Sequence, residues 1–246
     1  MNGIKTVFWD LDGTIAETEI YGHRIAFNNA FKEFGLDWIW NSNEYKNLLK
    51  ISGGKNRIKH YSQIEKISLK EEDIIRIHKI KQHYYTQLVQ SGKIPLRVGV
   101  ERLISQLYSM NVYQYLVTTS GRKAAMALME KSLANYREIF AGFITYEDVE
   151  KHKPYPDAYL KALSLSRSNN SNSIVIEDSA IGLKAALNAG LKCIITLSPW
   201  TEFSANCFNG AEAIVDSLGS NDDKTHLFLG KELIKQYVCA DYLNSL

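Results

Sequence analysis

The chain has 246 residues, of which 45% are hydrophobic and 23% charged, and its formal net charge is +2. This composition is typical of a folded globular protein with room for two domains, and the near balance of charge argues against nucleic acid as a main partner. The chain has three scattered cysteines and no apolar run near 18 residues, and its start leads directly into a strand. These features favour a cytoplasmic protein. The same features argue against disulfides, a zinc site, an export signal and a membrane partner.

The first predicted element is a short apolar strand that ends in two acids. The stretch from Thr6 to Thr14 reads TVFWDLDGT, and alternation along an extended segment points Asp10 and Asp12 the same way. Two carboxylates in one place call for a cation or a shared proton between them. A hairpin, an EF-hand loop or helix capping would be simpler explanations. However, helical periodicity follows from Ala16 to Phe34, Gly13 stands too early for an EF-hand, and capping does not explain the first acid.

The next part of the chain is predicted to be entirely helical. One helix ends at Gly35 and a second runs from Glu71 to Gln90, and no convincing strand lies between Ala16 and Gly92. We therefore expect an inserted helical domain at residues 17–92, within a core formed by residues 1–16 and 93–246.

From Pro95 onward, predicted strands alternate with predicted helices. The strands lie at 113–117, 142–145, 173–176, 192–197 and 213–215, and helices begin near residues 122, 156 and 180. This alternation predicts an α/β fold with a Rossmann-like parallel sheet and helices on both faces. The stretch after about residue 217 carries no interpretable motif, and a final helix is predicted from Gly230 to Tyr242.

Polar residues follow the predicted strands, where parallel sheets bind ligands. They are Asp10 and Asp12, then Thr118-Thr119-Ser120, then Glu177-Asp178, and a nearby loop adds Lys153. Each alone fits a helix cap or a solvated lysine. Together, hydroxyls and a lysine form a phosphate cradle, and three carboxylates form a Mg²⁺ site. Phosphate and magnesium in one place imply phosphoryl transfer.

In order and location, these motifs resemble the four motifs of the haloacid dehalogenase-like hydrolase superfamily, over residues 5 to about 200. The helical insertion looks like the type-1 cap of the phosphoglycolate phosphatase and β-phosphoglucomutase group. Within that group the first third resembles the CbbY proteins, which are phosphatases of xylulose-1,5-bisphosphate linked to the Calvin cycle. The residues that carry this resemblance are Ala16-Glu17-Thr18-Glu19, Gly22-His23-Arg24, Ala26-Phe27-Asn28, Gly35-Leu36-Asp37-Trp38 and Gly53-Gly54-Lys55-x-Arg57-Ile58.

The resemblance implies a role for each core residue. Asp10 is the nucleophile that forms an aspartyl-phosphate, and Asp12 is its acid/base partner. Mg²⁺ is expected at the Asp10 carboxylate, the Asp12 backbone carbonyl and Asp178, with Glu177 close behind. The phosphate oxygens are expected to bind Lys153 and the loop Thr118, Thr119 and Ser120.

The inserted domain is expected to supply specificity and to exclude water. Lys55 and Arg57, after the Gly53-Gly54 turn, suit a second phosphate that does not react, although they also fit a plain turn with surface cations. His23 and Arg24 face the substrate or pack within the cap. Two further residues are candidates for the substrate's hydroxyls and far end: Glu17 and Arg122.

These features predict a monomeric Mg²⁺-dependent phosphatase of small sugar phosphates, most specifically of xylulose-1,5-bisphosphate. A β-phosphoglucomutase is the near alternative. In that family a cap histidine stands one position earlier, where this chain has Gly22 before His23. A catalytically silent phosphate-binding protein is a third possibility, which the presence of both Asp10 and Asp12 disfavours.

Overall fold

The computed structural model describes residues 3–51, 53–200 and 205–246. The chain divides into two compact units, a core of Met1–Glu17 and Pro95–Leu246 and a helical unit of Thr18–Ile94. None of the described helices combines the length and the apolar composition needed to cross a membrane.

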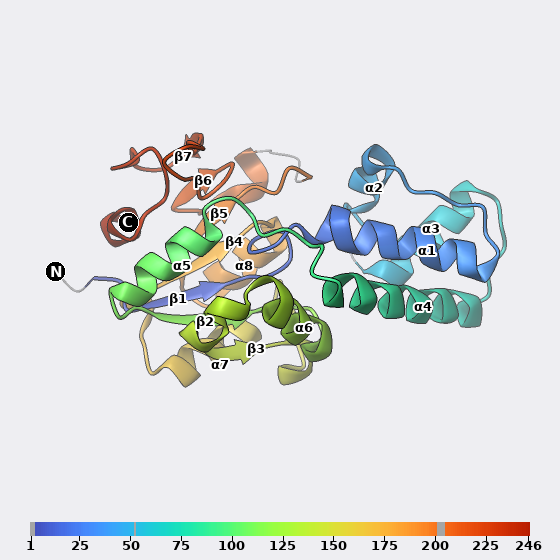
Figure 1. Cartoon of the computed structure of the whole chain (residues 1–246), viewed down its shortest axis with the longest axis horizontal. Helices are drawn as coiled ribbons and strands as arrows, with labels where there is room; N and C mark the ends of the chain where they lie inside the picture. Colours follow the sequence, from blue (N-terminus) through green and yellow to red (C-terminus); the bar gives the residue numbers. More distant parts are fainter. Residues whose placement is uncertain (1–2, 52, 201–204) are drawn as a thin grey trace. The chain divides into compact units, whose positions relative to one another are not determined.

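The core is built on one sheet, drawn as arrows in Figure 1. Its strand order is β3-β2-β1-β4-β5-β6-β7, and the described strands pair in parallel except for β6 with β7. The strands are β1 Thr6–Trp9, β2 Tyr113–Val117, β3 Phe140–Ile144, β4 Ser173–Glu177, β5 Lys192–Thr196, β6 Ala213–Val215 and β7 Leu227–Leu229. The predicted Rossmann-like α/β core is thereby confirmed.

Helices cover both faces of this sheet because alternate strand residues point to opposite sides. Phe8 and Val175 belong to the apolar cluster that α7 and α8 cover. On the other side, Trp9 donates to Gln114, whose amide donates to the Ile104 carbonyl in α5. The core helices are α5 Val100–Ser109, α6 Arg122–Ser132, α7 Asp157–Ser166, α8 Ala180–Asn188 and α9 Ala240–Ser245. Short 3₁₀ turns occupy Ala134–Ile139, Tyr146–Asp148, Asn170–Asn172 and Ala205–Phe208.

The strand order explains where a site forms. The chain passes from β1 to β2 and β3 on one side, and then returns to β4 on the other side of β1. Register keeps the three central strands level, since Trp9 pairs with both Leu116 and Ile176. The residues that follow β1, β2 and β4 therefore meet at the carboxyl edge of the sheet, at its topological switch point.

The helical unit contains η1 Glu19–Arg24, α1 Ile25–Phe34, α2 Ser42–Leu48, α3 Gly54–Ile64 and α4 Glu71–Gln90. The predicted helix from Ala16 starts later than expected, because residues 12–16 form a turn and 19–24 form a π-helix ahead of α1. Gly35 ends α1 at a φ of 89°. The unit's interior is an aromatic cluster: Phe27, Phe31, Trp38, Trp40, Tyr45 and Tyr61.

The predicted final helix over Gly230 to Tyr242 is wrong. After β7, residues 230–239 are irregular with a bridge between Lys235 and Tyr237, and the short helix α9 begins only at Ala240. Tertiary pairing overrides helix propensity here, because backbone groups of this stretch bond to the loop after β6, as Val238 N does to Leu218 O.

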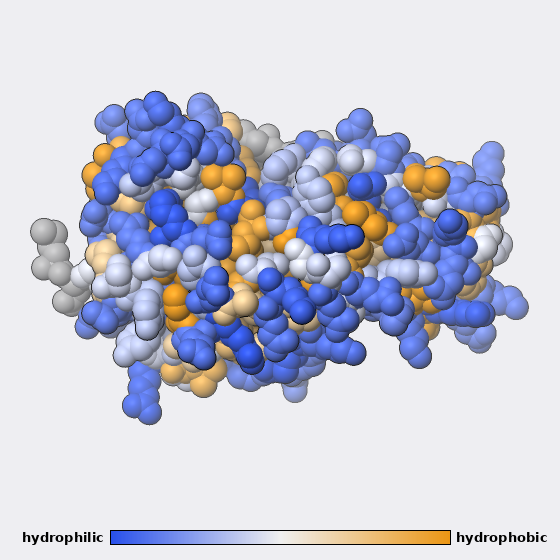
Figure 2. Space-filling model, viewed as in Figure 1, coloured by the Kyte–Doolittle hydropathy of each residue, from blue (hydrophilic) through white to orange (hydrophobic). Residues whose placement is uncertain are grey.

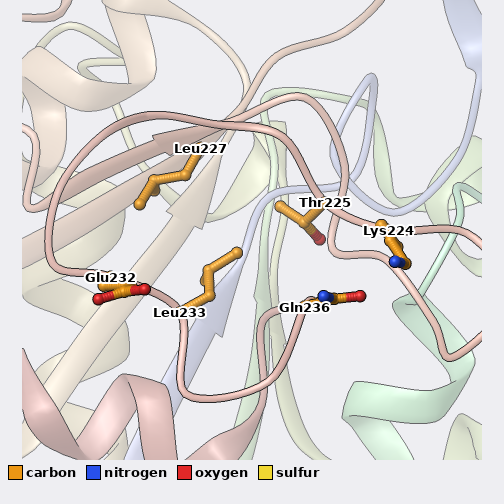
Figure 3. A pocket seen from close by; sticks show the side chains of 6 residues that line it. All are labelled: Lys224, Thr225, Leu227, Glu232, Leu233 and Gln236. Carbon is orange, nitrogen blue, oxygen red and sulfur yellow. The ribbon is translucent and has the colours of Figure 1, made fainter.

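Two surface features complete the fold. On the face shown in Figure 2, hydrophilic residues predominate and hydrophobic ones lie scattered among them. A shallow depression of about 340 Å³ lies in the C-terminal segment, where the apolar Leu227 and Leu233 are flanked by polar side chains (Figure 3). It contains none of the predicted site residues.

Candidate active site

The ammonium group of Lys153 is the centre of the polar cluster at the sheet edge. Its three N–H groups donate to Asp10 Oδ1 at 2.6 Å, to Glu177 Oε1 at 2.6 Å and to the Val117 carbonyl at 2.9 Å. Its side chain is 5% exposed. One buried cation thus connects the ends of β1, β2 and β4, and all of its donors are used.

The side chain of Glu177 is fully buried and accepts hydrogen bonds from several side chains. Besides Lys153, it accepts a hydrogen bond from the Tyr159 hydroxyl at 2.7 Å and one from the Ser179 hydroxyl at 3.2 Å. A Cβ at Gly182 would lie 1.9 Å from the carboxyl carbon of Glu177. The first turn of α8 can therefore approach the Glu177 side chain this closely only with glycine at position 182. Such a fixed carboxylate orients Lys153 and the neighbouring Asp178.

Asp12 contacts the loop after β2. Its Oδ2 accepts a hydrogen bond from Ser120 Oγ at 2.6 Å and a longer one from Thr118 Oγ1 at 3.3 Å. Thr118 Oγ1 in turn accepts from the Ser120 backbone N–H. The two acids of the first motif therefore have different surroundings, an ammonium group for Asp10 and hydroxyls for Asp12. Different surroundings are what separates the roles of two neighbouring carboxyl groups.

Three carboxylates are placed to share a cation. One oxygen each from Asp10, Glu177 and Asp178 lies within 4.8 Å of the others. Gly13 approaches this group so closely that a Cβ there would lie 2.2 Å from Asp178 Oδ2. Hard carboxylate oxygens suit Mg²⁺, and the single positive charge of Lys153 is smaller than the charge of three ionised carboxylates. The donor set therefore fits a divalent cation.

The electrostatics of the cluster agree with this. The pKa of Asp10 is raised from 3.8 to about 7: burial is the largest cause, Lys153 opposes it, and the charges of Glu177 and Asp12 raise the pKa further. Burial lowers the pKa of Lys153, but Asp10 and Glu177 more than compensate, so it is raised overall and Lys153 stays charged. Without a further cation, the cluster holds a carboxyl group that is ionised only near or above neutral pH.

Three further residues predicted for the site belong to the core unit. Thr119 is exposed on the loop after β2. Arg122, at the start of α6, pairs with Asp148 at 2.6 Å and is half exposed. Glu17 pairs with Arg97 at 2.9 Å and is 16% exposed. Burial raises the pKa of Glu17, and Arg97 opposes this effect.

The helical unit holds the remaining predicted residues. His23 Nδ1 lies 2.8 Å from Lys81 Nζ, and its ring stacks on Tyr85 at 4.0 Å. A Cβ at Gly22 would lie 2.7 Å from the Tyr85 ring, so the preceding position has no room for a side chain. Arg24 donates to the carbonyl of Trp40 at 3.3 Å.

Around the Gly53-Gly54 turn the cations differ in their contacts. Gly53 precedes α3 with a φ of 85°, and Gly54 is its first residue. Lys55 is exposed. Arg57 is held by two groups of its own unit, because it donates to the Ile51 carbonyl at 2.9 Å and to the Tyr45 hydroxyl at 3.3 Å.

Three residues with prominent contacts in the structure carried little signal in the amino-acid sequence. Lys81 is 5% exposed, with its ammonium group over the rings of Phe27 and Tyr85. Its signal was a charged residue on the apolar stripe of the helix Glu71–Gln90. Tyr159 and Arg97 carried no local signal, since their partners lie far away in sequence.

Comparisons with known proteins indicate the same kind of chemistry as the residues of the site. The family model described as "Haloacid dehalogenase-like hydrolase" matches residues 7–196. Protein CbbY of Cereibacter sphaeroides is 35% identical over 215 residues, which cover 87% of this chain and 92% of that protein. The plasmid-encoded Protein CbbY of Cupriavidus necator is 36% identical over 222 residues, covering 88% and 86% of the two chains.

Solved structures give the same result. CbbY from Rhodobacter sphaeroides in complex with phosphate superposes with a TM-score of 0.76 at 34% identity, covering 87% of this chain and 94% of that one. A mutant of the same protein, in complex with xylulose-(1,5)bisphosphate, matches equally well. A putative β-phosphoglucomutase from Thermotoga maritima, at 19% identity and a TM-score of 0.68, shares the fold.

The matched span contains Asp10, Asp12, Lys153 and the acids that follow β4. The chain therefore belongs to the haloacid dehalogenase-like hydrolase family, in its CbbY-like branch, and is a phosphoric monoester hydrolase.

Proposed function

We propose that the enzyme is a Mg²⁺-dependent phosphatase of small phosphorylated sugars, and that xylulose-1,5-bisphosphate is hydrolysed to xylulose 5-phosphate and phosphate. The observation that carries the proposal is the cluster in which Lys153 binds both Asp10 and Glu177 beside Asp178. The xylulose-(1,5)bisphosphate complex of the similar CbbY mutant supports the choice of sugar.

Asp10 is the proposed nucleophile. Its carboxylate attacks phosphorus, a carboxyl–phosphorus bond forms and the bond to the sugar oxygen breaks. Asp12 gives a proton to the departing oxygen and afterwards takes one from the water that cleaves the aspartyl-phosphate. Thr118 and Ser120 each have one hydroxyl proton, which is donated to Asp12 here. We propose that these hydroxyls turn to donate to phosphate oxygens when the substrate binds.

The carboxylates of Asp10 and Asp178, with the Asp12 backbone carbonyl, would hold the Mg²⁺ ion. Bound there, the ion would reduce the repulsion between the nucleophile and the phosphate and would neutralise the charge that develops on the phosphate oxygens. Lys153 keeps Asp10 oriented, and its charge adds to the stabilisation of the same oxygens.

The helical unit is proposed to recognise the phosphate that does not react. Lys81 Nζ lies 2.8 Å from His23 Nδ1, and burial and the charges of Lys81, Lys55 and His23 lower the pKa of His78 to about 4, so the two lysines lie near each other around these histidines. Lys55 is exposed, and Arg57 is oriented by Tyr45. We propose that Lys55 and Arg57 bind the second phosphate, with His23 and Arg24 nearby, and that Glu17 and Arg122 bind sugar groups.

A screen of phosphate release with Mg²⁺ tests the proposal. Xylulose-1,5-bisphosphate, C5 and C6 sugar monophosphates and β-glucose 1-phosphate are compared under one set of conditions. We expect most rapid phosphate release from the bisphosphate, with Asp10→Asn as the inactive control. Conversion of β-glucose 1-phosphate to glucose 6-phosphate without release would instead identify a mutase.

The second-phosphate role has a test of its own. Lys55→Met is expected to raise KM for the bisphosphate about tenfold while leaving KM for a monophosphate nearly unchanged, because only one substrate has the group to lose. Lys59→Met is the matched control, since Lys59 is also an exposed lysine on α3. Equal effects of Lys55→Met on both substrates would contradict the role.

A further inference from the structure

Arg97 makes more polar contacts than its place between two elements would suggest. It follows Leu96, two residues after the chain re-enters the core, and its side chain is 5% exposed. Its Nη1 donates to the carbonyls of Gly13 at 2.6 Å and Thr196 at 2.8 Å. Its Nη2 donates to the carbonyls of Leu197 at 2.6 Å and Asp216 at 3.0 Å.

The fifth donor, Nε, pairs with Glu17 Oε1 at 2.9 Å. All five N–H groups of the guanidinium are therefore used, each by an acceptor on a different residue. Thr196 ends β5, Leu197 directly follows it, and Asp216 directly follows β6. Arg97 thus anchors two other features, Gly13 and Glu17, to the carboxyl ends of these two strands.

The anchored loop is part of the active site. Gly13 follows Asp12, and the glycine approaches Asp178 so closely that no Cβ fits between them. The loop is closed by Gly13 N donating to the Ala16 carbonyl at 2.9 Å. Arg97 also pairs with this segment through its backbone, donating from its N–H to the Ile15 carbonyl at 2.9 Å. A shift at Gly13 would therefore move both Asp12 and the space beside Asp178.

We propose that Arg97 is a positioning residue for phosphoryl transfer: its guanidinium holds the Asp12–Gly13 loop and the Glu17 carboxylate in place against the ends of β5 and β6. Arg97 contacts no reacting atom in this arrangement and acts through the residues that it fixes. The planar fork is essential to this role, because an ammonium group has only three donors and cannot bridge four carbonyls and a carboxylate.

The core contains a matched control. Arg102, on α5, is half-buried and also donates to backbone carbonyls: those of Gly219 at 3.1 Å, Leu218 at 2.8 Å and Val238 at 2.7 Å. These acceptors belong to the C-terminal segment and not to the site. Replacement of either arginine removes several charged hydrogen bonds, but only one of the two anchors the Asp12 loop.

The experiment compares Arg97→Lys and Arg97→Gln with Arg102→Lys and Arg102→Gln. Each variant is assayed with Mg²⁺ and p-nitrophenyl phosphate, which lacks sugar hydroxyls and a second phosphate. The main test is therefore independent of the sugar substrate proposed above. Thermal unfolding without metal gives the stability of each protein, and all assays are run well below the lowest melting temperature. Hydrogen exchange of the peptide covering residues 10–17 reports on the loop itself.

We expect both Arg97 variants to lose kcat by roughly 10- to 100-fold, the scale of a misplaced catalytic group or a lost positioning contact, with little change in KM. Exchange in residues 10–17 should accelerate. The Arg102 variants should lose melting temperature but keep kcat within about twofold. Lysine at position 97 should not restore kcat, since charge alone cannot replace the fork.

Three results would overturn the proposal: an Arg97 variant that keeps its kcat and its slow exchange, Arg102 variants that lose as much kcat, or a failure of both Arg97 variants to fold. The last would show that Arg97 serves the fold itself. If the wild-type enzyme hydrolyses p-nitrophenyl phosphate but no sugar phosphate, the proposed substrate fails while the role of Arg97 remains open to the same test.

Discussion

Replacement of Asp10 by asparagine should stabilise the metal-free protein at alkaline pH, although it should abolish catalysis. The pKa of Asp10 is raised from 3.8 to about 7, mainly by burial. Between these two values the folded state holds a proton that the unfolded state has lost. The stability that this proton contributes is therefore fully present below pH 3.8 and is lost as the pH rises through 7.

The gap between the two pKa values corresponds to about 4 kcal/mol at ~1.36 kcal/mol per pKa unit. Asparagine cannot ionise, so the variant should lack this pH-dependent loss, and Lys153 would keep its ion pair with Glu177. Between pH 5 and pH 8 only the two pH units from 5 to 7 contribute, which is about 3 kcal/mol at ~1.36 kcal/mol per unit. For a chain of this size, the melting temperature of the variant relative to the wild type should therefore be roughly 5–10 °C higher at pH 8 than at pH 5.

Thermal unfolding of both proteins in EDTA from pH 5 to 9 measures the effect, because titrations common to the two proteins cancel in the comparison. Asp222→Asn, which changes an exposed acid of the C-terminal segment, is the control and should follow the wild type. Parallel pH curves for the wild type and Asp10→Asn would refute the reasoning, since Asp10 would then be ionised in the folded protein without cost.

Two further substitutions test the site. Lys153→Met should destabilise the metal-free protein by about 3–5 kcal/mol in urea unfolding, because it leaves two buried carboxylates without their cation, whereas Lys161→Met, at a 42% exposed lysine, should cost below about 1 kcal/mol. Equal losses would contradict the pairing. Gly13→Ala places a Cβ against Asp178 and should weaken Mg²⁺ binding, measured by calorimetry, about 10-fold or more. Gly35→Ala has a similar φ, 89° against 86°, but no atom within 4 Å, so it should leave Mg²⁺ affinity unchanged. A comparable loss in both would point to backbone strain alone.

Local patterns in the sequence were enough to predict the core. The strand Tyr113–Val117 and the helix Glu71–Gln90 have the bounds that periodicity indicates, because each buries one regular face or a continuous apolar run. The motif residues at the strand ends could be named in advance for the same reason. In a parallel sheet, the residue that follows a strand lies at the carboxyl edge whatever the packing.

Only the tertiary structure decided the contacts between residues far apart in sequence. Residues 230–239 are not helical, because backbone groups such as Val238 N bond to the loop after β6. Tyr159 reaches Glu177, and Arg97 bridges Gly13 to β5 and β6. Such contacts depend on which elements are neighbours, and no local pattern encodes that. The sequence by itself thus identified the acids, hydroxyls and lysine of the proposed site. The packing of distant segments determined how each of them is held.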